Sequence, residues 1–206
     1  MNSEQNLIPT PFNGPQLKSG IPAITIQEES PEDDLENVLW IDFDSGEDSV
    51  DGMKCAGPQT YVISPVSEQN FFSDKYLNCI GTVGIGRDKT SGTEIAFLGH
   101  LDPAFILHRG PEATERLTSD LRAALNDLVA RSEKGTVEVV LLGGNDTLDD
   151  PSSKKSTDYQ KSIEAIQAVV QEVMGFTPTI LSGPNHLGGA IDITVITDER
   201  KIVVGK

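Results

Sequence analysis

The sequence predicts an α+β fold, in which a strand-rich, β-sandwich-like core is flanked by two or more helices and preceded by a disordered acidic N-terminal region. Three observations lead to this prediction. Acidic residues crowd into the first quarter of the chain, short apolar runs alternate with Gly-rich turns further on, and two longer segments repeat apolar residues at helical spacing. We place the boundary after residue 55, so that residues 56–206 form the folded domain.

Residues 1–55 carry most of the negative charge of the 206-residue chain. They hold 12 acidic residues against 2 lysines, which gives −10 of the formal net charge of −16. Such a composition cannot bury enough apolar surface to offset the loss of chain entropy, so we expect this region to be largely disordered. The cluster around the single tryptophan, Trp40, could dock on the domain or on a partner protein, or the region could be a solubilising tail.

The composition also limits the partners and cofactors. A charge of −16 without a Lys/Arg cluster would repel nucleic acid and anionic membranes, so we expect neither as a partner. No apolar run approaches the roughly 20 residues that cross a bilayer. With two cysteines, three histidines and no CxxC or HExxH spacing, we expect free thiols and no metal site.

The pattern from Tyr61 onward is that of a compact domain. Apolar residues at 117, 121, 124, 125 and 128 predict a helix from Pro111, and a second helix is expected over about 157–174, ended by Gly175. The turn at 87–92 makes the segment from Cys79 to His100 hairpin-like. Strands are expected at 60–64, 79–87, 93–101, 136–144, 190–197 and 201–205, with one more after the second helix.

Cys79 and His100 are the candidate catalytic pair. A thiolate is a strong nucleophile, and a nearby imidazole can take the thiol proton. The hairpin would bring His100, at the end of one strand, beside the loop that carries Cys79, whereas Cys55 lies in an acidic segment that disfavours a thiolate. Buried cysteines and strand-end histidines are also common as plain core residues, so the pair alone leaves both interpretations open.

The order of features from Ser73 to the C-terminus resembles the chemoreceptor glutamine deamidase family, CheD, and related cysteine-dependent deamidase toxins. "LNCIG" stands where the family has its cysteine and "GHLDP" where it has its histidine. A helix, a strand ending in "GG", a second helix, a strand, a Gly-rich turn and a terminal hairpin follow in the family's order. Leu77 and Asn78 depart from the family's glycine and serine, and Ser73 stands at the family's threonine, six residues before Cys79.

The resemblance implies a protein glutamine deamidase that needs no cofactor. Cys79 would be the nucleophile that forms a thioester with a glutamine side chain of a protein substrate, His100 the general base and acid, and Ser73 the orienting hydroxyl. Backbone N–H groups around Cys79 and Gly81 would hold the oxyanion. Substrate contacts are expected from these residues near the pair and in the Gly-rich loop: Asn78, Gly81, Asn185 and His186.

Several alternatives stay open. The departures at Ser73, Leu77 and Asn78 favour a CheD-like binding protein without activity, and a cysteine protease or transglutaminase would use the same Cys–His pair. For the deamidase too, the charge of the acidic N-terminal segment and its Trp40 cluster suggest that it binds a partner or covers the site until it is released. Because the N-terminus lacks the order of a cleaved signal peptide, we expect a cytoplasmic protein, or an effector or toxin secreted into a host cell without one.

Overall fold

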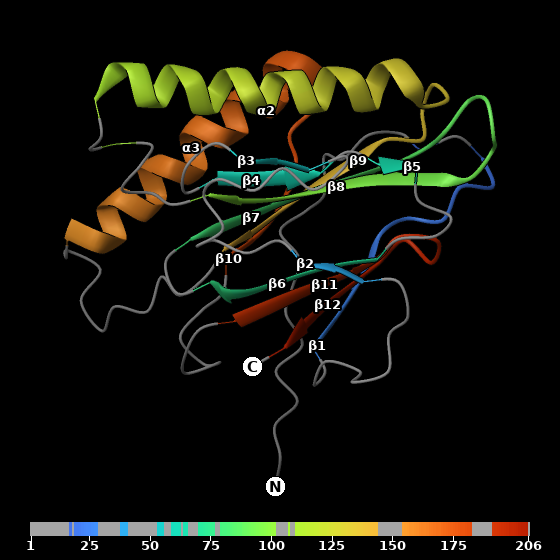
Figure 1. The fold of residues 1–206 in the computed structure, drawn as a ribbon, viewed down its shortest axis with the longest axis horizontal. Coiled ribbons are helices and arrows are strands. Elements are labelled where there is room, and N and C mark those ends of the chain that lie inside the picture. The colour runs from blue at the N-terminus through green and yellow to red at the C-terminus, as the bar shows by residue number, and fades with distance from the viewer. Residues whose placement is uncertain are drawn as a thin grey trace, which may run out of the picture.

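The computed structural model has three layers, in which two helices lie over one mixed sheet and a second mixed sheet packs on the other face of the first (Figure 1). It describes residues 17, 19–28, 38–40, 53–55, 59–62, 64–65, 70–76, 79–101, 107, 110–143, 154–182 and 191–205. The α+β fold is therefore confirmed, with a strand-rich sandwich core and helices on one side.

The helix-covered sheet has the strand order β10-β9-β7-β8-β4-β3, and β5 also pairs with β8. Its strands are β3 (Met53–Cys55), β4 (Gln59–Val62), β5 (Ser64–Pro65), β7 (Ile80–Arg87), β8 (Glu94–Leu101), β9 (Glu138–Gly143) and β10 (Thr179–Ser182). Strands β7 and β8 form the expected antiparallel hairpin, with Gly92 at φ 75° in its turn. Because β7 pairs with β8 on one side and β9 on the other, it lies inside the sheet, and its residues are almost all buried.

The second sheet has the order β1-β12-β11-β6-β2. Its strands are β1 (Thr25–Glu28), β2 (Val38–Trp40), β6 (Asn70–Tyr76), β11 (Ile191–Ile196) and β12 (Lys201–Gly205). The hairpin of β11 and β12 was expected, whereas β6 has no counterpart among the strands expected from the sequence. In Figure 1 this sheet lies on the side away from the helices.

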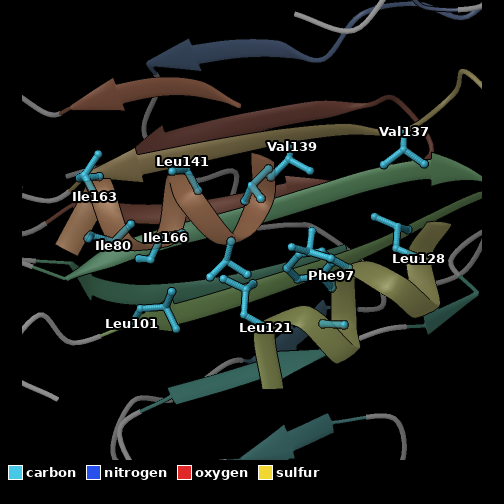
Figure 2. Close-up of a cluster of buried hydrophobic side chains, with 14 of the residues drawn as sticks. Ile80, Phe97, Leu101, Leu121, Leu128, Val137, Val139, Leu141, Ile163 and Ile166 are labelled. Atoms are coloured by element: carbon cyan, nitrogen blue, oxygen red, sulfur yellow. The ribbon is translucent and has the colours of Figure 1, made fainter. Parts of the chain in front are cut away.

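Both helices use the apolar faces that their sequences predict. Helices α2 (Pro111–Arg131) and α3 (Lys154–Met174) pack on β7, β8 and β9. Figure 2 shows this layer, in which side chains of the helices meet side chains of the sheet: Leu121, Leu128, Ile163 and Ile166 from the helices, and Ile80, Phe97, Leu101, Val139 and Leu141 from the strands. Gly175, at φ 74°, ends α3 as expected, and its N–H donates to Gln171.

A glycine in β7 lets α2 approach the sheet closely. A Cβ atom at Gly84 would lie 2.9 Å from Leu128 of α2 and 2.3 Å from the ring of Phe97. Side chains cannot approach so closely, so a larger residue would push the helix off the sheet. The Gly-rich composition of this strand therefore serves helix packing at this position.

The layer between the two sheets is apolar in the middle and polar at both ends. Side chains from both sheets fill the middle, among them Val83, Leu98, Val140, Ile193 and Ile202. At one end, the fully buried Arg200 donates to Glu94 and Glu138, at 2.7 and 2.9 Å. These ion pairs tie the turn between β11 and β12 to the other sheet, at the end of β8 opposite to His100.

Three short strands lie within residues 1–55, where we expected largely disordered chain. The parallel strand β1 pairs with β12, and the N–H of Ile24 donates to Glu138 at 2.9 Å. Strand β2 pairs in parallel with β6, so the backbone around Trp40 docks on the domain, one of the options that its apolar cluster suggested. Strand β3 pairs with β4. The rest of this region lies outside the described residues, except residues 17 and 19–24.

Candidate active site

Ser73, Cys79 and His100 meet at the polar end of the inner layer that lies opposite to Arg200. His100 follows Ala96 and Leu98 along the face of β8 that looks toward the second sheet. In the hairpin register His100 pairs with Gly81, so Cys79, two residues earlier, lies on the same face as a diagonal neighbour of His100. His100 is 1% exposed and Cys79 7%, so both side chains are buried in the inner layer.

The Ser73 side chain joins the two sheets at this point. Its Oγ lies 3.0 Å from Nδ1 of His100 in a buried hydrogen bond, whose donor depends on the imidazole tautomer. Ser73 stands on β6 and His100 on β8, which belong to different sheets. The structure therefore places Ser73 and His100 in contact and Cys79 on the same inner face, and the catalytic roles of the three residues stay predictions.

A bulge in β6 places a fourth side chain at the same site. Tyr76 pairs with Ile191 and Ser73 with Ile193, so two residues of β6 stand opposite the single Asp192 of β11. In a regular strand Ser73 and Tyr76, three positions apart, would point to opposite faces. The extra residue restores the same direction, and both are fully buried in the inner layer.

Tyr76 stacks on the imidazole of His100. The ring centroids lie 4.0 Å apart and the ring planes differ by 15°. Burial raises the pKa of the Tyr76 phenol far above its usual value; Ser73 opposes this rise, while Cys79 and Asp74 add to it. The hydroxyl makes no hydrogen bond of good geometry to any residue in the described part of the chain. The phenol therefore stays neutral across the physiological pH range.

The absence of a side chain at Gly81 leaves space for the Ile193 side chain and the stacked Tyr76 ring. A Cβ atom there would lie 2.5 Å from the Ile193 side chain and 3.3 Å from the Tyr76 ring. Because β7 is paired on both sides, the backbone of Gly81 also belongs to the sheet. The described structure thus gives Gly81 a packing role, and its contact with a substrate stays a prediction.

The remaining expected substrate contacts lie outside the described residues. Asn78 precedes Cys79 in the chain, and Asn185 and His186 fall between the end of β10 and the start of β11. The sequence reasoning missed Tyr76, because a strand with strict alternation would have turned it away from Ser73. Its only sequence signal is an aromatic residue in a polar segment between the expected hydroxyl and the cysteine.

The arrangement is chemically suited to activate a thiol. When Nδ1 carries the imidazole proton and donates it to Ser73, Nε2 has the lone pair that a general base needs. Within the described ranges no group of three or more His, Cys, Asp and Glu side chains could hold a metal ion. The groups at hand for nucleophilic and acid–base chemistry are therefore a thiol, an imidazole and a hydroxyl, with the Tyr76 ring stacked on the imidazole.

No protein-family model and no curated protein matches this chain. Neither described helix combines the length and the apolar character of a membrane span.

Proposed function

We propose that this protein is a CheD-like glutamine deamidase, which converts a glutamine side chain of a target protein to glutamate. One observation carries the proposal: the 3.0 Å hydrogen bond between Ser73 Oγ and His100 Nδ1 lies on the same buried face as Cys79. The hydrogen bond at Nδ1 favours an imidazole orientation and tautomer in which Nε2 serves for proton transfer.

The first half of the reaction forms a thioester. Nε2 of His100 takes the proton of the Cys79 thiol, and the sulfur forms a bond with the carboxamide carbon of the glutamine. The resulting oxyanion accepts hydrogen bonds from backbone N–H groups near Cys79. When the C–N bond breaks, His100 returns the proton to the leaving nitrogen, and ammonia departs.

The second half uses water. His100 takes a proton from a water molecule, whose oxygen bonds to the thioester carbon, and then returns the proton to the sulfur as the C–S bond breaks. The products are glutamate and the regenerated thiol, so glutamine and water have become glutamate and ammonia. No electrons change hands, and the chain's own residues carry every proton.

The test is peptide mass spectrometry of candidate chemoreceptor or host proteins after co-expression with this protein. We expect a gain of about one dalton at a glutamine with the wild-type chain and none with Cys79→Ser. His100→Ala serves as the second inactive control, because it keeps the nucleophile and removes the base. If both variants modify the target as the wild type does, the reaction does not use this site.

The same experiment separates the alternatives. A transglutaminase would add the mass of an amine at the glutamine, and a cysteine protease would leave new peptide ends. A binding protein would yield a stable complex with no mass change in either form. Because the shape of the surface around a site sets the choice of target, tests against both cytoplasmic proteins and host proteins are needed.

A further inference from the structure

We infer that Tyr76 is a positioning residue, whose ring holds the imidazole of His100 in the plane required for proton transfer from Cys79. The inference deepens the proposed function, and its importance for catalysis rests on that function. The expected Cys–His pair and the expected hydroxyl assign no role to Tyr76. The geometry of the stack and the bulge that creates it carry the argument.

The Ser73 hydrogen bond alone cannot fix the imidazole. A histidine side chain turns about a broad, roughly two-fold outer torsion, and one hydrogen bond at Nδ1 still permits the ring to swing about that contact. A parallel ring at a centroid distance of 4.0 Å restrains the remaining direction, because any tilt brings the imidazole edge into the phenol face. Together the two contacts fix the position of Nδ1 and the tilt of the His100 ring plane.

The stack also suits the charge that His100 gains. Taking the thiol proton makes the imidazole a cation, and the face of a tyrosine ring attracts a cation whose centre lies within about 6 Å. Burial keeps the phenol neutral, so its attraction for the cation comes from the face of the ring. The Tyr76 ring therefore favours the protonated base that must form after Cys79 loses its proton.

The backbone is arranged specifically for this contact. The β6 strand carries its bulge between Ser73 and Tyr76, which turns both into the inner layer that holds His100. A side chain at Gly81 would clash with Ile193 and would also press on the Tyr76 ring. Bulges interrupt the hydrogen-bond ladder of a sheet and are frequent beside active sites, where they redirect a side chain. A core aromatic residue such as Phe71 on the same strand needs neither device.

The test compares Tyr76→Leu and Tyr76→Phe with Phe71→Leu. Phe71 is also fully buried in the inner layer on β6, so its loss creates a comparable cavity without removing a ring from His100. The first readout is the rate at which iodoacetamide alkylates Cys79, measured by peptide mass spectrometry on the folded protein. The second is the pair of ¹⁵N chemical shifts of the His100 ring, which report its tautomer and hydrogen bonding.

We expect Tyr76→Leu to slow alkylation about threefold to tenfold and to shift the His100 signals, as the usual strength of an aromatic pair implies. Tyr76→Phe keeps the ring and should retain the wild-type rate and signals. Phe71→Leu should lower the melting temperature about as much as Tyr76→Leu, with alkylation unchanged. These readouts need no deamidation substrate, so they can fail or succeed independently of the proposed reaction.

Three outcomes would overturn the inference. Wild-type alkylation and wild-type His100 signals in Tyr76→Leu would show that the imidazole needs no stack. An equal loss in Tyr76→Phe and Tyr76→Leu would assign the effect to the hydroxyl and not to the ring. An equal slowing in Phe71→Leu would mean that any cavity in this layer disturbs Cys79, which leaves Tyr76 no particular role.

Discussion

Removal of the Ser73 hydroxyl tests the hydrogen bond on which the proposed function depends. In Ser73→Ala, Nδ1 of the 1% exposed His100 loses the hydrogen bond that joins it to Ser73 Oγ at 3.0 Å. Leaving one buried polar group unsatisfied costs about 1–3 kcal/mol. If the imidazole relieves this cost by leaving its reactive orientation, the rate falls between about fivefold and about 150-fold, since 1.36 kcal/mol corresponds to a factor of ten.

The assay is the second-order rate of Cys79 alkylation by iodoacetamide, with Cys55 in the same chain as the internal reference. Ser73→Thr is the matched control, because it keeps the hydroxyl and adds only a methyl group in a buried position. We expect the threonine variant to retain most of the rate and the Cys55 rate to stay constant. A Ser73→Ala rate within twofold of the wild type, with His100→Ala strongly slowed, would refute the orienting role of the hydroxyl.

Three further predictions concern stability. Arg200→Met should lower the free energy of unfolding by about 3–5 kcal/mol, because Glu94 and Glu138 would lose their buried partner. Urea unfolding measures this free energy, and a decrease of less than about 1 kcal/mol would contradict the prediction. Gly175→Ala should lower the melting temperature through a cost of about 1 kcal/mol, since its φ of 74° disfavours a side chain although nothing lies within 4 Å. Deletion of residues 1–55 removes three paired strands and should lower the urea midpoint, whereas faster Cys79 alkylation with an unchanged midpoint would indicate that this region covers the site.

The helices and the central hairpin could be predicted because their signals are local. The apolar residues at 121, 124, 125 and 128 face the sheet as their helical spacing requires, and the apolar run of β7 belongs to a strand buried on both faces. Gly175 ended its helix as expected. In each case a few neighbouring residues determine the conformation, so a single sequence contains the necessary information.

The second sheet could be predicted only in part, because several of its strands depend on distant partners. The polar residues of β6 break the strand pattern, and the bulge opposite Asp192 is defined by pairing with β11, more than a hundred residues later. Strand β1 forms on β12 and is held by Glu138 from the other sheet. An acidic, Pro-containing composition indicates disorder on average, but it cannot show which short segments find an edge strand.

The candidate site could be predicted as a set of residues but not as a geometry. The spacing of six between Ser73 and Cys79 identified the hydroxyl only through a family resemblance, since no local rule connects a serine on one sheet to a histidine on the other. Tyr76 was missed because its direction follows from the bulge. Such contacts between sheets depend on tertiary packing, which alternation along a single strand does not encode.

The buried polar groups that join the two sheets lie at opposite ends of the inner layer. The two sheets are joined by ion pairs of Arg200 at one end and by the Ser73–His100 hydrogen bond at the other. The six residues from Glu94 to His100 along β8 separate the two ends by about 20 Å. Packed apolar side chains fill the space between these ends and resist changes in the spacing of the sheets. The ion pairs can therefore align the sheets, while the proposed function assigns the reaction to the hydroxyl, imidazole and thiol at the other end.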